Sequence, residues 1–166
     1  DPVENPGGPL YSYTIHLADL MEHLFGEVLE VEAMCAKVGG PSSTDDAASA
    51  LLRFKSGLMG MLLSSYLAPL RFSFDILGTK ASLSLSSERM PKLQADEELM
   101  ENAPVLDVGC DFTKGRDIAN REQFTDLAKC IRQGGEPEVT GVHGVRALAI
   151  MRAMLRSHAE RRLVSL

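Results

Sequence analysis

The chemically most informative residues lie near the N-terminus, where His16 precedes Asp19 by three positions. Residues three apart share one face of a helix, so the imidazole and the carboxylate can join one hydrogen-bond system. An imidazole titrates near neutral pH and can accept a hydroxyl proton while hydride leaves the same carbon. We therefore consider His16 a candidate catalytic residue for alcohol oxidation, with Asp19 beside it in the substrate site. A lone histidine in an amphipathic helix is more often structural, and that alternative stays open.

Two hydroxyl side chains, Ser12 and Tyr13, precede His16 by about one helical turn. Hydroxyl groups at this position suit a hydroxylated ligand, and we predict both residues to bind substrate. The alternative is equally open, because a serine can cap a helix start and a tyrosine can pack as an aromatic ring.

The other histidines do not indicate a metal site. His23 follows His16 by seven residues, which places it roughly 10 Å away along a helix, too far to bind the same ion without other ligands. His143 and His158 are fifteen positions apart near the C-terminus, where we predict structural or solvated roles. We expect no bound metal.

The cysteines indicate neither a disulfide framework nor a zinc site, because there are three, far apart and never in a C-x-x-C pair: Cys35, Cys110 and Cys130. A reducing cytoplasm is the expected location. No cysteine has a neighbouring histidine that would lower its pKa, and no serine lies in a G-x-S-x-G motif, so nucleophilic catalysis has no support.

Composition favours one compact domain without nucleic-acid or membrane partners. The chain has 166 residues and 45% hydrophobic content, enough for a sizeable core. Its 17 basic and 23 acidic residues give a formal charge of -6, and no basic stripe is present that would follow a phosphate backbone. The apolar runs are shorter than the ~20 residues that span a bilayer.

The spacing of apolar residues predicts an α+β fold. Residues 1–9 are turn-rich and resemble a linker, so we expect a further segment before them. Apolar residues three and four positions apart predict helices. Segments in which apolar and polar residues alternate, joined by short turns, predict an antiparallel meander. The predicted helices are 10–25, 117–132 and 140–161, and the predicted strands are 28–37, 46–54, 60–67, 71–77, 82–86 and 163–166. Residues 88–111 have weak periodicity, with one or two edge strands expected.

These elements predict a predominantly antiparallel open sheet with helices packed on one face. On the helix at 117–132 we expect an inner face made of Phe124, Leu127, Ala128 and Ile131. Several strands are apolar on both sides, for example residues 60–63, whereas helices can cover only one side. A self-associating sheet face, and hence a homo-oligomer, is predicted. The methionines at positions 59, 61, 151 and 154 fit packing, including packing between subunits.

Several segments in order resemble the C-terminal domain of the glucose-fructose oxidoreductase, inositol dehydrogenase and MocA family. The matching segments are GGPL at 7–10, IHLADL at 15–20, LFGEV at 24–28, DAASALLRFKSG at 46–57, ILGTKASL at 76–83, FTDLAKCI at 124–131, PEVTG at 137–141 and ALAIMRAMLRS at 147–157. Each match is loose, but their order covers nearly the whole chain.

The resemblance implies a single C-terminal substrate-binding and oligomerisation domain over residues 1–166, with the fold of the C-terminal domains of dihydrodipicolinate reductase and glyceraldehyde-3-phosphate dehydrogenase. It implies an N-terminal Rossmann domain, absent from this chain, that binds NAD or NADP, so this chain alone is expected to hold no cofactor and to be inactive. By motif position His16 matches the family histidine that acts on the substrate hydroxyl, and Asp19 matches the carboxylate three residues later.

One segment departs from the family pattern. Many members have Asp and Gly where this chain has Ser12 and Thr14. We predict an NAD(P)-dependent oxidoreductase acting on a sugar, cyclitol or related hydroxylated molecule. The alternative is a non-catalytic ligand-binding and oligomerisation module, in which the change at Ser12 marks lost catalysis. A weaker hypothesis uses transient oxidation to assist elimination or glycoside cleavage.

Overall fold

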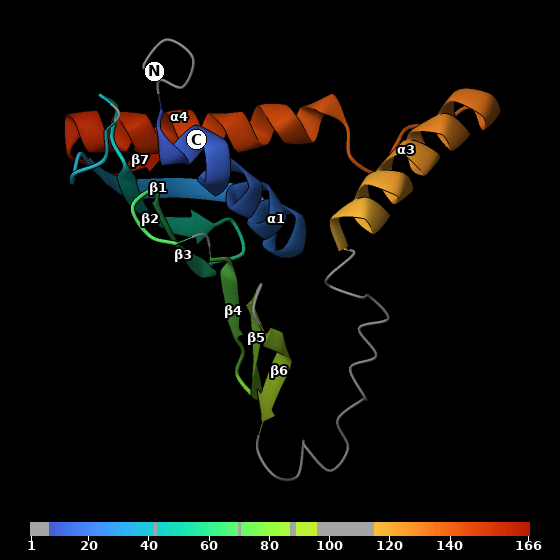
Figure 1. The fold of residues 1–166 in the computed structure, drawn as a ribbon, viewed down its shortest axis with the longest axis horizontal. Coiled ribbons are helices and arrows are strands. Elements are labelled where there is room, and N and C mark those ends of the chain that lie inside the picture. The colour runs from blue at the N-terminus through green and yellow to red at the C-terminus, as the bar shows by residue number, and fades with distance from the viewer. Residues whose placement is uncertain (1–6, 42, 70, 87–88, 96–114) are drawn as a thin grey trace. The chain divides into compact units, whose positions relative to one another are not determined.

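The computed structural model divides the chain into two compact units (Figure 1). The first comprises Asp1–Ala68 with Val139–Leu166, and the second comprises Pro69–Glu138. Each unit is considered by itself below. The structure describes residues 7–41, 43–69, 71–86, 89–95 and 115–166.

A four-stranded antiparallel sheet with the order β3-β2-β1-β7 forms the centre of the first unit. Along each strand, side chains point alternately to opposite faces. The paired residues Val31 and Leu52 are buried on one face, whereas Met34 and Leu51 are exposed on the other. The strands are β1 (Val28–Ala36), β2 (Ala47–Phe54), β3 (Met59–Ser65) and β7 (Val164–Ser165). The four strands predicted in these regions are confirmed, with ends shifted by one or two residues.

A tight turn joins β2 to β3 and fixes their register. Gly57 has φ 88° and its N–H donates to the Phe54 carbonyl, while the Phe54 N–H donates to the Leu58 carbonyl. A positive φ favours glycine because it lacks a β-carbon. The KSG sequence at 55–57 was predicted as this turn, and the antiparallel pairing that it implies is confirmed.

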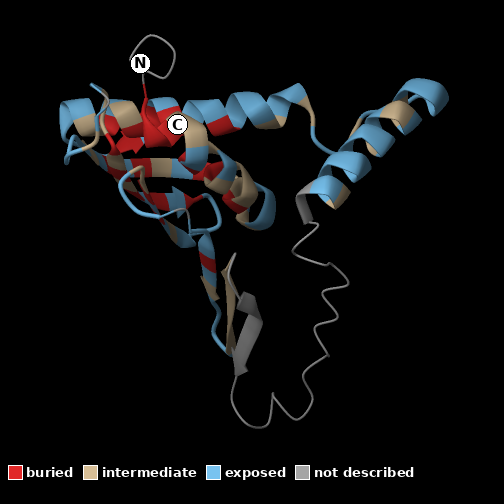
Figure 2. Cartoon of the chain, in the orientation of Figure 1, coloured by how far each residue is buried: buried red, intermediate tan, exposed pale blue. Residues whose placement is uncertain are grey.

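Helices α1 (Ile15–Phe25) and α4 (Gly141–Glu160) cover one face of this sheet, and Figure 2 shows the buried residues gathered there. Ile150, Met151 and Met154 of α4 are fully buried, and each such side chain contributes about 1.5–3 kcal/mol to folding. Helix α1 lies close to β3, since a β-carbon on Gly60 would be 2.2 Å from Met21 Cε. The prediction of an α+β fold with helices on one face of an antiparallel sheet is confirmed.

The helix predicted over 10–25 is two segments, because its first turn is the π-helix η1 (Leu10–Thr14), which precedes α1. The Ile15 N–H donates to the Leu10 carbonyl, five residues back rather than four. Thr14 is 1% exposed, and its hydroxyl is 2.6 Å from Ser64 Oγ and donates to the Pro9 carbonyl at 3.3 Å. A periodic pattern cannot reveal this wide turn, because it is held by a residue fifty positions away.

The second unit contains a three-stranded antiparallel sheet with the order β4-β5-β6. Its strands are β4 (Ser73–Leu77), β5 (Ala81–Ser86) and β6 (Arg89–Ala95). Strands β3 and β4 belong to different sheets, so the single meander predicted from the sequence is divided there. Pro69 lies between them and has no N–H to donate to a ladder, which accounts for the break. The strand at 89–95 agrees with the expected edge strand, and residues 96–114 lie outside the described residues.

Helix α3 (Gly115–Gln133) confirms the helix predicted at 117–132. Of the side chains predicted for an inner face, Phe124, Leu127 and Ile131 are exposed, and Ala128 is half-buried. Helical spacing shows which residues share a face, but burial of that face needs a packing partner that spacing does not specify. None of the helices in the described part of the chain is long and apolar enough to cross a bilayer.

Candidate functional site

The four predicted site residues lie on two successive helical segments, η1 and the start of α1. Tyr13 and His16 are exposed, whereas Ser12 and Asp19 are half-buried. No hydrogen bond or ion pair joins His16 to Asp19 among the residues that the structure describes, so their shared hydrogen-bond system stays a prediction. The His16 side chain is exposed on the first turn of α1.

Tyr66, which follows β3, contacts Ser12 and Tyr13, two of the three residues predicted to bind substrate. Its hydroxyl donates towards Ser12 Oγ at 2.5 Å and towards the Gly8 carbonyl oxygen at 2.9 Å. Its ring meets that of Tyr13 edge to face, with centroids 5.4 Å apart and an interplanar angle of 77°. Tyr66 was not among the residues predicted for the site. The available signal was the pair Ser64 and Tyr66, two polar side chains that share one face at the end of a strand.

The turn before η1 depends on Gly8. Its φ is 53°, and a β-carbon built on it would be 2.2 Å from the Asp45 carbonyl oxygen. Both constraints favour glycine, and the second requires the absence of a side chain. The chain therefore enters η1 at a fixed position between Asp45 and Tyr66.

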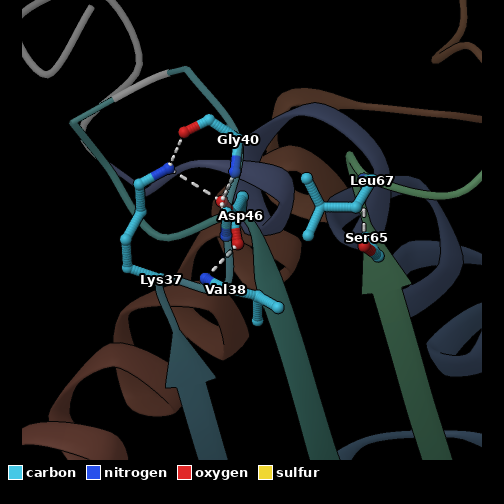
Figure 3. A network of polar contacts seen from close by, with 7 residues as sticks. Lys37, Val38, Gly40, Asp46, Ser65 and Leu67 are labelled. Carbon is cyan, nitrogen blue, oxygen red and sulfur yellow. Dashed lines mark hydrogen bonds and ion pairs between the residues drawn. The ribbon is translucent and has the colours of Figure 1, made fainter.

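Asp46 holds the neighbouring loop by accepting several hydrogen bonds (Figure 3). Its carboxylate accepts from the N–H groups of Val38 at 2.7 Å, Gly39 at 3.1 Å and Gly40 at 2.6 Å, and from Lys37 Nζ at 2.8 Å. The Lys37 ammonium, followed by these backbone donors, holds the pKa of the Asp46 carboxyl well below its usual range. This carboxylate is occupied within the protein, so we assign it a structural role.

The histidines of the C-terminal helix have the structural roles predicted for them. His143 Nδ1 accepts from the Thr140 N–H at 3.0 Å and completes a capping box at the start of α4. His158 Nδ1 accepts from the Cys35 N–H at 3.1 Å, and Ser157 Oγ accepts from the Ala33 N–H at 2.9 Å. These two side chains therefore accept hydrogen bonds from β1 N–H groups that lie beyond the short stretch of β1 paired with β7.

Cys35 is a poor nucleophile. Burial raises the pKa of the Cys35 thiol to about 11, and the negative charge of Asp45 adds to this effect.

Among the described residues, no three His, Cys, Asp or Glu side chains gather in a way that could hold a metal ion.

An antiparallel sheet with helices α1 and α4 on one face defines an α+β domain. The chain belongs to the glucose-fructose oxidoreductase, inositol dehydrogenase and MocA family, because the family profile described as the oxidoreductase family, C-terminal alpha/beta domain, matches residues 2–166. The resemblance noted in the sequence is therefore confirmed.

Among curated proteins, the chain is similar to D-apiose dehydrogenase of Paraburkholderia graminis and inositol 2-dehydrogenase of Rhizobium meliloti. Identity to the first is 25%, over 92% of this chain and 43% of that protein. Identity to the second is 26%, over 100% of this chain and 52% of that protein. The chain thus spans about half the length of the curated relatives it matches.

Solved structures share the fold. A putative NADPH-dependent oxidoreductase from Desulfitobacterium hafniense has a TM-score of 0.77 and 25% identity, with 99% of this chain and 50% of that chain covered. The WlbA dehydrogenase from Bordetella pertussis, solved with NADH and UDP-GlcNAcA, has a TM-score of 0.77 and 24% identity, with 92% of this chain and 46% of that chain covered. The second likeness concerns the fold alone.

Proposed function

We propose that this chain is the substrate-binding and catalytic-histidine domain of an NAD(P)-dependent oxidoreductase that acts on a sugar, cyclitol or related hydroxylated molecule. The observation that carries the proposal is the exposed His16 next to Ser12 and Tyr13, in a chain matched over residues 2–166 by the oxidoreductase family. A nucleotide-binding domain joined to this one in the whole protein would hold the cofactor. No residue of this chain is assigned to the cofactor.

The proposed chemistry is conversion of a CH–OH group to a carbonyl group, or the reverse. The nicotinamide, when bound, supplies the hydride acceptor or donor. His16 accepts the hydroxyl proton through its neutral imidazole during oxidation and returns it during reduction. The open position of His16 fits this role, because a ligand and a second domain can both approach the ring. Ser12, Tyr13 and Asp19 offer polar groups to the other hydroxyls of the substrate.

The test joins the domain to the nucleotide-binding half encoded with it and measures reduction of NAD and NADP over a panel of sugars and polyols. His16→Ala should lower kcat roughly 100-fold to 10,000-fold. His23→Ala is the matched control, because His23 is also an exposed histidine on α1 and should leave kcat unchanged. Absence of cofactor binding and of turnover over the whole panel would reject the proposal.

Two rival functions give different outcomes in the same assay. A non-catalytic ligand-binding and oligomerisation module predicts that His16→Ala changes neither function nor assembly. Oxidation-assisted elimination or glycoside cleavage predicts an altered product without net reduction of the nicotinamide, whereas simple dehydrogenation gives one reduced nicotinamide per carbonyl product.

We also propose that the uncovered face of the first unit's sheet mediates self-association in this protein. The supporting observation is a group of exposed apolar side chains on adjacent strands: Met34, Leu51, Met59, Met61 and Leu63. Their pairing in the sheet places them in one patch, and contiguous exposed apolar patches mark interaction sites. A location in the cytoplasm, without nucleic-acid or membrane partners, remains part of the proposal.

A further inference from the structure

The end of β3 holds the segment that carries the candidate site. Ser64 and Tyr66 are two residues apart, and both contact η1 or the turn before it. Ser64 Oγ is 2.6 Å from the buried hydroxyl of Thr14, at the C-terminal end of η1. Tyr66 contacts Gly8 in the turn before η1, and Ser12 and Tyr13 within η1. The wide helical turn and the residue that leads into it are therefore held by side chains from one strand end.

Tyr66 is the more specific of the two anchors because its side chain contacts three residues of this segment, whereas that of Ser64 contacts one. Its hydroxyl donates towards the Gly8 carbonyl oxygen and Ser12 Oγ, and its ring packs edge to face with the ring of Tyr13. The phenol has one hydrogen, which is shared between these two acceptors, so it ties the position of the Ser12 side chain to that of the Gly8 turn. The edge-to-face geometry of the two rings is one that aromatic pairs favour.

Tyr66 is itself fixed through its backbone. Its N–H donates to the Asp46 carbonyl oxygen at 2.9 Å, next to the carboxylate that binds residues 37–40. Asp46 is 1% exposed, and its own N–H donates to the Ala36 carbonyl oxygen. Residues 37–40, Asp46, the end of β3 and η1 are therefore connected by one continuous set of hydrogen bonds.

We propose that Tyr66 is a positioning residue that sets Ser12 and Tyr13 relative to His16 and thereby determines how tightly the hydroxylated substrate binds. This role rests on the proposed function, because it assumes that Ser12 and Tyr13 meet the substrate. Tyr66 does not exchange a proton with the substrate and is not a catalytic residue. It acts by limiting the conformations of η1, which reduces the ordering that substrate binding would otherwise require.

The first measurement is amide hydrogen exchange in the full 166-residue chain. Tyr66→Phe keeps the ring contact with Tyr13 and removes the hydroxyl, so the amides of η1 and Ile15 should exchange roughly fivefold to tenfold faster. Tyr11→Phe is the matched control, since it makes the same chemical change on the same π-helix outside the Tyr66 contacts. It should leave exchange unchanged. Equal exchange in Tyr66→Phe and the original chain would overturn the proposal.

The second measurement uses the joined two-domain protein. Tyr66→Phe should raise KM for the hydroxylated substrate roughly fivefold to tenfold, while KM for the nicotinamide and kcat change less than twofold. A merely structural role would not separate the two KM values. An unchanged substrate KM with active enzyme overturns the substrate role of Tyr66.

A second variant keeps the test decisive if Tyr66→Phe does not fold. Ser12→Ala removes the Tyr66–Ser12 contact from the other side and should also speed exchange at Ile15. In the double variant the combined effect should be smaller than the sum of the two, because both changes remove the Tyr66–Ser12 bond, whereas only Tyr66→Phe also removes the bond to the Gly8 carbonyl oxygen. If neither the original protein nor any variant shows turnover, the proposed function is rejected, and with it the substrate role of Tyr66. The exchange data would still decide whether Tyr66 anchors η1.

Discussion

Gly8 and Asp45 approach so closely that a β-carbon on Gly8 would be 2.2 Å from the Asp45 carbonyl oxygen. Since Gly8 also has φ 53°, Gly8→Ala meets both a steric clash and an unfavourable backbone conformation. We expect this change to lower the free energy of unfolding by about 1–3 kcal/mol, as measured by urea denaturation.

Gly144→Ala provides the control for this prediction. Gly144 lies within α4, and a β-carbon there would meet nothing within 4 Å. Alanine stabilises a helix interior by roughly 0.5–1 kcal/mol relative to glycine, so this variant should be slightly more stable. An equal loss of stability in both variants would contradict the specific role of Gly8.

Asp46→Asn should lower Tm by several degrees at pH 7, because the neutral amide accepts more weakly and does not pair with Lys37. Folding lowers the pKa of Asp46, so its ionised form contributes stability above the unfolded pKa of about 4. That contribution disappears as pH falls towards the folded pKa. The difference in Tm between the two proteins should therefore shrink from about pH 5 downwards. A difference that stays constant to pH 2 would be incompatible with the lowered pKa.

Much of the architecture followed from local sequence patterns. The alternation in β1 and the KSG turn at 55–57 specify the strands and their pairing, because both depend on near neighbours. The anchoring of His16's helix did not follow, because Thr14 and Ser12 meet partners about fifty residues away. The exposed face of α3 shows the same limit, since helical spacing does not identify a packing partner.

The helical position of the candidate residues followed from the sequence, whereas their roles stay predictions. The i, i+3 spacing placed His16 and Asp19 on one helix, and family resemblance supplied the proposed role of the histidine. Tyr66 was missed, because a tyrosine after a strand has no motif that connects it with Ser12. Only the fold places its hydroxyl 2.5 Å from Ser12 Oγ.

Cys35 should react slowly with alkylating reagents. Its pKa is raised from 9.0 to about 11, so at pH 8 the thiolate fraction is roughly a hundredfold smaller than for an ordinary cysteine. In a chain with Cys110→Ser and Cys130→Ser, the iodoacetamide rate of the folded protein should rise roughly tenfold between pH 9 and pH 10, because the Cys35 pKa lies above both values. The same chain unfolded in urea is the control, and its rate should rise no more than about twofold over this interval. An equally small rise in the folded protein would contradict the buried thiol.

The uncovered sheet face should be the surface through which the protein self-associates. Met61 is 74% exposed and lies beside Leu51 in the paired strands, so a charge there should oppose burial of the patch between subunits. Met61→Lys should convert an oligomer to a monomer in light scattering, while the free energy of unfolding of the dissociated domain changes by less than about 0.5 kcal/mol. Val145→Lys is the matched control, because Val145 is 68% exposed on α4, away from this face, and should leave assembly intact. A lysine ammonium buried between apolar side chains would lack a partner that offsets its lost hydration, so an oligomer that tolerates Met61→Lys would exclude this face as the contact. A strictly monomeric original chain at high concentration would exclude it as well.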